Sequence, residues 1–221
     1  MEILSQLSLT DQKTIYSIIS VSFAILAFIP AFIETWIIKD QYDVRPTISG
    51  WLSWVASDVA ILSAMIVRDD ISWQMVPYVF GSSILIILAL RKGWKIARIR
   101  GESTSWKDPF MDWNHKDTIC IGIVAAAIVV WSISRDPDYA IYLTAISATI
   151  GAFAIWVPLI ANPYREPLNA WVLFLVGGVF GLAAVNEWTL AGALIPVMCF
   201  VVQATMVTLT ARRFLPQFAR V

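Results

Sequence analysis

One carboxylate, Asp58, lies inside an otherwise uncharged hydrophobic run from residue 47 to residue 67. Trp51, Trp54 and Asp58 are spaced at i, i+3 and i+7, which places them on one face of a helix. A carboxylate at the centre of a bilayer costs about 2.5–3.5 kcal/mol or more, so such residues usually face the protein interior and serve function. Asp58 is therefore the first candidate for binding a proton, a cation or a hydroxyl-bearing solute. The alternative is a protonated or serine-bonded carboxyl group that only fixes helix packing.

Polar side chains in other hydrophobic segments are candidates for the same site. Counted at ~1.5 Å per residue, Asp58 lies roughly halfway across its segment, and several hydroxyl groups of other segments fall at a similar depth. We expect the lining of a binding site to comprise Asp58, Trp54, Ser82, Ser83, Ser147, Thr149 and Gln203. An indole face suits stacking on a flat or cationic solute. Trp54 equally fits the aromatic belt of a membrane interface, and Trp73 and Tyr78 are expected to be interfacial anchors.

The remaining reactive residues do not converge on a catalytic or metal site. The only histidine, His115, has scattered carboxylates around it and no nearby cysteine, which is a poor basis for metal binding. Cys120 and Cys199 lie in hydrophobic segments and are expected to pack as small apolar residues rather than to form a disulfide. No hydrolase triad or phosphate-binding loop is present in the sequence. We therefore expect no enzyme, no cofactor and no metal.

Membrane-spanning helices must position these residues. Of the 221 residues, 58% are hydrophobic and 14% are charged, whereas about 25% are charged in a soluble domain. A span needs ~20 mostly apolar residues, and long apolar runs favour helices over barrel strands. The sequence predicts an all-α membrane protein with helices over 14–33, 47–67, 73–90, 118–134, 139–161, 168–186 and 188–210.

The distribution of basic residues predicts the orientation of the chain. With the 91–117 loop in the cytoplasm, 13 of the 16 Lys and Arg residues lie on the cytoplasmic side. The positive-inside rule then predicts an outside N-terminus and an inside C-terminus. Basic residues after position 90 are expected to lie as a juxtamembrane helix on anionic lipid rather than to bind nucleic acid.

The first three and the last three predicted helices share landmarks. In both triplets a proline stands near the end of the first helix, another proline opens the second helix, and a tryptophan follows it, Trp51 or Trp171. The prolines, which are candidate hinges of a gate, are Pro30, Pro46, Pro158 and Pro167. With one helix between them, the triplets have the same orientation, which defines a parallel repeat. The predicted units are a first repeat (1–92), a basic loop with a linker helix (93–138) and a second repeat with the tail (139–221).

This 3+1+3 arrangement resembles the SWEET and PQ-loop superfamily of membrane proteins, in which two three-helix units flank a linker helix. The resemblance covers nearly the whole chain and includes the four prolines near the cytoplasmic gate. Two motifs also resemble a group of prokaryotic seven-helix proteins of about this length, namely Pro46-x-x-Ser49-x-Trp51-x-x-Trp54 and Pro163-x-x-Glu166-Pro167.

The sequence departs from the superfamily in two places. The Pro-Gln pair is absent, because Ala31 follows Pro30 and Leu159 follows Pro158. SWEET transporters have an asparagine on the third helix of each repeat, where this chain offers serine in one repeat and cysteine or glutamine in the other. Sugar specificity is therefore not implied.

The resemblance implies a transporter of a small polar or cationic solute in a prokaryotic cytoplasmic membrane. It would work by alternating access, with rocking of the two triplets about the prolines and with Asp58 as a binding or proton-coupling group. Association with further copies of the chain would also fit the family. The alternative is a receptor or assembly scaffold on the same fold, which binds a partner without flux and uses the 91–117 loop as its contact surface.

Overall fold

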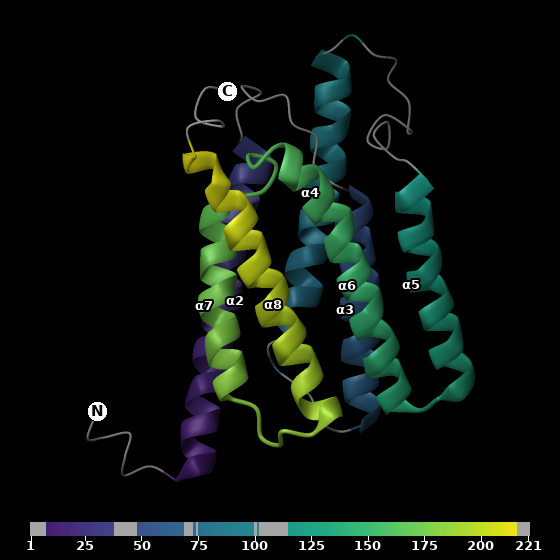
Figure 1. Ribbon diagram of the computed structural model, residues 1–221, viewed down its shortest axis with the longest axis vertical. Helices are drawn as coiled ribbons and strands as arrows, with labels where there is room; N and C mark the ends of the chain where they lie inside the picture. Colours follow the sequence, from purple (N-terminus) through teal and green to yellow (C-terminus); the bar gives the residue numbers. More distant parts are fainter. Residues whose placement is uncertain are drawn as a thin grey trace.

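The computed structural model describes residues 8–37, 48–68, 73, 75–99, 101 and 115–215. Within these ranges the chain forms seven α-helices and one short 3-10 helix, and no strand (Figure 1). The elements are α2 (Leu9–Ile37), α3 (Ile48–Arg68), α4 (Met75–Ile99), α5 (His115–Ser134), α6 (Pro137–Ala161), α7 (Leu168–Ala183), α8 (Leu190–Ala211) and η3 (Arg212–Phe214). The prediction of an all-helical fold is confirmed for this part of the chain.

Local sequence signals set several helix boundaries. The Ser8 hydroxyl accepts the backbone N–H of Asp11 at 3.2 Å, so α2 begins earlier than the apolar run alone predicted. Pro137 occupies the first position of α6 after the capping residue Asp136, where a missing N–H is tolerated. The largest difference is in α4, which continues to Ile99. The basic segment after residue 90 therefore continues α4 as far as Ile99, instead of beginning a separate loop.

Five helices are long and apolar enough to cross a membrane, namely α2, α3, α4, α6 and α8. The apolar parts of the other two, Ile121–Ser134 and Leu168–Ala183, are shorter. The 16 residues of α7 span about 24 Å, against a hydrocarbon core of about 30 Å. Large apolar side chains such as Ile18 and Phe153 are exposed on the outside of the helices, as lipid contact requires. These features indicate an integral membrane protein.

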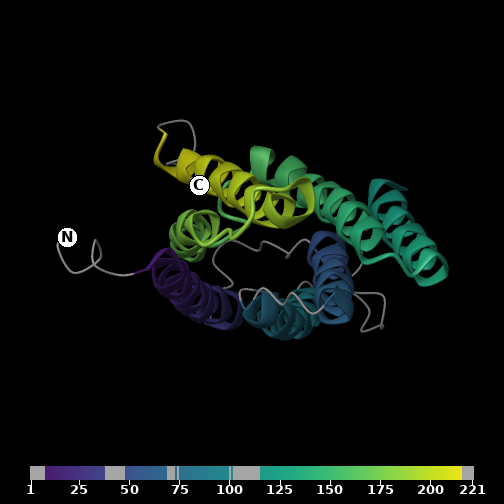
Figure 2. The same cartoon turned by 90° about the horizontal axis from the view of Figure 1, so that it is seen from below.

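Six helices form a closed ring, which is seen end-on in Figure 2. Contacts run around it in the order α2, α4, α3, α6, α8, α7 and back to α2. We call α2, α3 and α4 the first group, and α6, α7 and α8 the second group. The groups meet at two junctions, α2–α7 and α3–α6, and α5 lies outside the ring against α6 and α3.

Small residues bring the two groups into close contact at both junctions. In the α3–α6 junction, a Cβ atom added at Gly151 would lie 2.8 Å from the Cβ atom of Ser53. In the α2–α7 junction, the buried hydroxyl of Ser20 donates to the carbonyl oxygen of Gly177 at 2.8 Å. Close approach through glycine and serine is a common means of packing helices in membranes.

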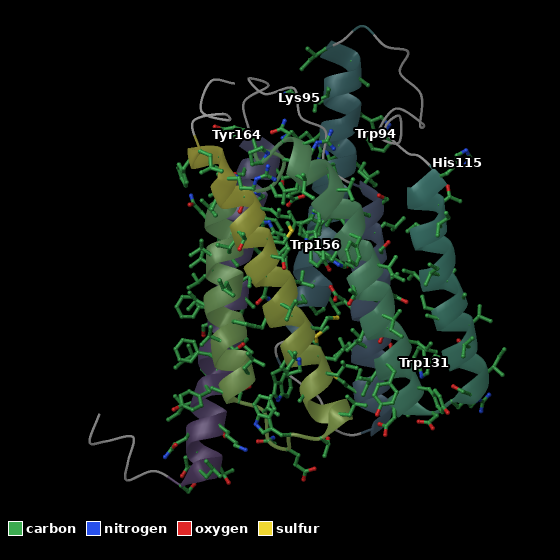
Figure 3. All side chains as sticks on the ribbon, viewed as in Figure 1. Trp94, Lys95, His115, Trp131, Trp156 and Tyr164 are labelled. Carbon is green, nitrogen blue, oxygen red and sulfur yellow. The ribbon has the colours of Figure 1, made fainter. Side chains whose placement is uncertain are left out.

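The two ends of the ring differ in charge. One end, called the basic end, holds the C-terminal parts of α2, α4 and α8 and the α6–α7 linker (Figures 1 and 3). Its described basic residues are Arg91, Lys92, Lys95, Arg98, Arg165, Arg212 and Arg213. Lys95 marks this end in Figure 3, and Trp131 marks the opposite end. At the opposite end Lys13 Nζ donates to the Asn186 carbonyl oxygen at 2.8 Å.

Two apolar clusters fill the ring interior. The cluster toward the basic end takes buried side chains from all six ring helices and includes Phe28, Trp51, Trp171 and Phe174. The cluster toward the opposite end comes from α3, α4, α6 and α8, and its members are Ile61, Ala64, Met65, Met75, Ile141, Ala145 and Ile195. Tyr78 packs against both clusters. The level of Tyr78 is therefore where the interior changes from one cluster to the other.

Candidate functional site

Asp58 lies in the middle of α3, as the eleventh of its 21 residues. The buried hydroxyl of Ser82, on α4, donates to Asp58 Oδ2 at 3.1 Å. The same hydroxyl also reaches the carbonyl oxygen of Tyr78 at 2.5 Å, and its single proton can serve only one acceptor at a time. A proton on the Asp58 carboxyl group would satisfy both contacts, because Asp58 would then donate to Ser82. The geometry thus suits a protonated Asp58 carboxyl group.

A second polar contact at this level joins the two groups. Nε2 of Gln203, a buried residue of α8, donates to the Tyr78 hydroxyl on α4 at 2.8 Å. Gln203 Oε1 has no hydrogen-bond partner and lies against Gly178 of α7. Cys199, one turn earlier in α8, lies within electrostatic range of Asp58. We call Asp58, Ser82, Tyr78, Gln203 and Cys199 the polar layer.

The other predicted lining residues make their hydrogen bonds outside this layer. Trp54 donates its indole N–H to the carbonyl oxygen of Ala148, on α6, at 2.9 Å. The three remaining hydroxyls are hydrogen-bonded within their own helices. Ser83, Ser147 and Thr149 donate to the carbonyl oxygens of Val79, Leu143 and Ala145 at 2.6, 2.8 and 2.8 Å. Of the predicted set, the structure brings Asp58 and Ser82 into contact and places Gln203 beside them through Tyr78.

Aromatic rings form a continuous column from the polar layer toward the basic end. Tyr78 contacts Phe174, with ring centroids 5.7 Å apart, and Phe174 contacts Trp171 at 5.4 Å. Trp171 in turn contacts Trp54 at 5.7 Å and Trp51 at 6.1 Å. Tyr78 therefore lies in the interior, and not at the membrane interface where the sequence had led us to expect it. A solute that left the polar layer toward the basic end would have to displace these rings.

The column ends at a buried carboxylate, Glu166, in the α6–α7 linker. Glu166 is only 4% exposed, and Trp51 Nε1 donates to its Oε1 atom at 3.3 Å. Burial is the largest influence and raises the pKa of Glu166 from 4.5 to about 7. Smaller influences that lower this pKa come from Trp51, Trp171, Arg165 and Lys92. The Trp171 indole acts from outside hydrogen-bonding geometry, since its N–H has no hydrogen-bond partner.

Arg213 fixes the linker that carries Glu166. Its Nη2 atom donates to the backbone carbonyl oxygens of Glu166 at 2.6 Å and Pro163 at 3.0 Å. Its guanidinium carbon lies 5.3 Å from the ring centroid of Tyr164, within the range of a cation–π interaction. The second group thus holds Glu166 in place, while Trp51 reaches it from the first group.

Sequence reasoning did not select Glu166 as a site residue. It stands directly before Pro167, at the place that Arg45 holds before Pro46 in the first half of the chain. An acid in a short linker flanked by prolines reads as a solvated loop residue. The sequence held one signal for this contact, the matching places of Trp51 and Trp171 in the two halves of the chain. Matched residues of a parallel repeat can meet near its axis, and Glu166 lies close to Trp171 in the sequence.

The predicted hinge prolines occupy different local positions. Pro30 lies inside α2 and Pro158 lies inside α6, where each removes one backbone donor from its helix. Pro167 is buried and immediately precedes the first residue of α7. Pro46 lies outside the described residues. Their action as hinges stays a prediction.

No metal site is formed within the described ranges, where no three His, Cys, Asp or Glu side chains come together to hold an ion. Comparisons with protein-family models, with curated proteins and with solved structures each gave no match. The chain is therefore defined by its own features, as an integral membrane protein with a ring of six helices and a polar layer inside it.

Proposed function

We propose that the chain is a membrane transporter of a small polar or cationic solute, in which two three-helix groups alternate access to Asp58. The observation that carries this function is the order of helices in the ring. In each group the third helix lies between the first two, α4 between α2 and α3, and α8 between α6 and α7. Each junction pairs the first helix of one group with the second helix of the other. This contact pattern is expected of a parallel repeat about an axis along the membrane normal, with α5 as the linker.

The charge of the polar layer supports a cationic solute or a proton. Within the described residues Asp58 contacts no Lys or Arg, and Ser82 is its hydrogen-bond partner. A partly buried carboxylate in an apolar interior without a positive partner is costly, so an incoming cation or proton would stabilise the layer. The unpartnered Oε1 atom of Gln203 offers a further acceptor to a solute that carries N–H or O–H donors.

The apolar clusters on either side of the polar layer fit a transport cycle. Each cluster closes the approach to Asp58 from one end of the ring, along the ring axis. A solute would therefore reach Asp58 only after one cluster opened. By the positive-inside rule, we infer that the basic end faces the cytoplasm, and the resemblance to prokaryotic seven-helix proteins supports a prokaryotic membrane. The exposed side chains of Arg91, Lys95 and Arg98 on α4 would then lie at the level of anionic lipid headgroups.

A ligand screen followed by counterflow tests the function. The thermal stability of the purified chain would be measured with glucose, lysine, thiamine and putrescine at pH 5.5 and 7.5. Compounds that raise the melting temperature would then be used as labelled tracers in proteoliposomes. Saturable counterflow supports transport. Stabilisation without counterflow would instead favour the receptor or scaffold that the sequence left open.

A further inference from the structure

Trp51 and Glu166 connect the two groups at the basic end. The Trp51 indole belongs to α3 of the first group, and Glu166 belongs to the linker of the second group. Trp51 is also packed against Trp171 of α7, and both indoles are more than nine-tenths buried. The hydrogen bond from Trp51 to Glu166 thus lies inside the aromatic contact that closes the column, and it cannot persist if the groups separate at this end.

We propose that Glu166 is a proton-binding latch, which holds the two groups together at the basic end while it is protonated and releases them when it ionises. In the closed arrangement the carboxyl group stays buried and accepts the Trp51 N–H. When the carboxyl group loses its proton to water at the basic end, the carboxylate gains by becoming hydrated. Hydration requires separation of Trp51 and Trp171, which would open the column toward this end.

Arg213 is what makes this linker respond as a unit. Its guanidinium group binds the backbone of Glu166 and Pro163, and Arg212 donates to the carbonyl oxygen of Ile160 at 3.2 Å. The end of α8 therefore keeps Glu166 attached to the second group. Movement at the latch would then begin between the groups, at the contact with Trp51, and would expose the linker to water.

The charged groups around Glu166 only partly offset the cost of burying its negative charge. Arg165 of the same linker and Lys92 of α4 act on it electrostatically, and Arg213 of η3 holds its backbone. Glu34 of α2 lies within electrostatic range of Lys92 and Arg213, so it competes for the same positive charges. α3 and α7 contribute the uncharged indoles. Desolvation by burial remains the larger influence on the pKa of Glu166.

The sign of the pH effect follows from the two states of the carboxyl group. Burial raises the pKa of Glu166 to about 7 in the closed arrangement, from 4.5 for a hydrated carboxyl group. The closed arrangement therefore binds the proton more tightly, and it is favoured below pH 4.5 and progressively lost as the pH rises through 7. Between pH 5.5 and pH 8, linkage predicts a ~30-fold fall in the ratio of closed to open molecules.

Hydrogen exchange followed by mass spectrometry measures the latch without any solute. The full chain would be compared with Glu166→Gln in lipid nanodiscs at pH 5.5 and 8, after correction for intrinsic exchange rates. We expect exchange in peptides covering 162–171 to rise up to ~30-fold at pH 8 in the wild type and less than ~3-fold in Glu166→Gln. Peptides covering the 184–189 hairpin should not respond. Glu187→Gln, which removes an exposed carboxylate at the opposite end, should behave as the wild type.

A second variant keeps the latch testable if Glu166→Gln fails to fold. Trp51→Phe retains an aromatic ring and the carboxyl group but lacks the N–H donor, so it should speed exchange of 162–171 at both pH values. An equal pH response in wild type and Glu166→Gln would overturn the latch, as would a response spread evenly over all peptides. The role of the latch in a transport cycle depends on the function proposed above, but this measurement does not. Absence of counterflow would refute transport and leave a positive exchange result intact.

Discussion

Alanine at Gly151 should force apart the α3–α6 junction, one of the two places where the groups meet. The added Cβ atom would lie 2.8 Å from Ser53 Cβ and 3.2 Å from Trp54 Cδ1. Ser53 Cβ is attached directly to the α3 backbone, so no side-chain rotation can remove the overlap. The opposing glycine, Gly50, is also confined, because a Cβ atom there would lie 3.2 Å from the Gly151 carbonyl oxygen. Relief requires a shift of one helix against the other.

Overpacking of this kind costs about 1–3 kcal/mol. For a chain of this size, 1 kcal/mol corresponds to a shift in melting temperature of about 2–4 °C. Gly151→Ala should therefore lower the melting temperature by roughly 2–12 °C, as followed by the intrinsic fluorescence of the tryptophans in detergent. The matched control is Gly122→Ala on α5, where an added Cβ atom meets nothing within 4 Å. That variant should be neutral or stabilised by up to about 1 kcal/mol, since alanine is the better helix former. Equal melting temperatures for the two variants would refute the close packing of α3 on α6.

Variants at three further positions test the contacts around the site. Glu166→Gln should flatten the pH dependence of stability, because burial raises the pKa of Glu166 from 4.5 to about 7 in the wild type. As the pH rises through that range, the stability of the wild type relative to this variant should fall by up to about 3 kcal/mol. Thermal melts of both proteins from pH 4.5 to 8 measure it, and parallel curves would contradict the burial of the carboxyl group. Arg213→Ala should cost about 1–3 kcal/mol of stability, because the carbonyl oxygens of Glu166 and Pro163 lose charge-assisted donors. Arg213→Lys should restore less than half of the lost stability, since lysine lacks the planar fork of arginine. Full restoration in the melt would argue against this geometry. Tyr78→Phe should cost about 1–3 kcal/mol by leaving the buried Gln203 amide without its acceptor, and an unchanged melting temperature would show that the amide finds another partner.

Hydrophobic windows predicted the helices well where charge and apolarity change at the same residue. The start of α7 at Leu168 and the end of α5 at Ser134 agree with the sequence. The end of α4 does not, because hydropathy falls at Arg91 while backbone hydrogen bonding continues. Along the extension Gly93, Ile96 and Ala97 remain buried, so one face stays apolar although the average does not.

The sequence predicted the level of the candidate residues along their helices, but not the direction in which their side chains point. Asp58 stood out because it is the lone charge of its segment, and counting residues placed Ser82 at nearly the same level. Depth alone cannot tell which way a hydroxyl points. Ser147 and Thr149 lie near the middle of α6, yet their hydroxyls bond to their own helix, as serine and threonine in helices often do. Glu166 was not selected, since its hydrogen bond with Trp51 joins residues that are 115 positions apart in the sequence.

Counterflow by proteoliposomes that contain wild type or Asp58→Asn tests the central claim most directly. The tracer would be the compound of the ligand screen that stabilises the wild type most, measured at pH 5.5 and 7.5. We expect saturable, pH-dependent exchange by the wild type and at least a ~10-fold lower rate for Asp58→Asn, because a missing charge-assisted contact is worth about 1.5–3 kcal/mol. Full and pH-independent exchange by Asp58→Asn would contradict the assignment of Asp58 as the binding or proton-coupling group.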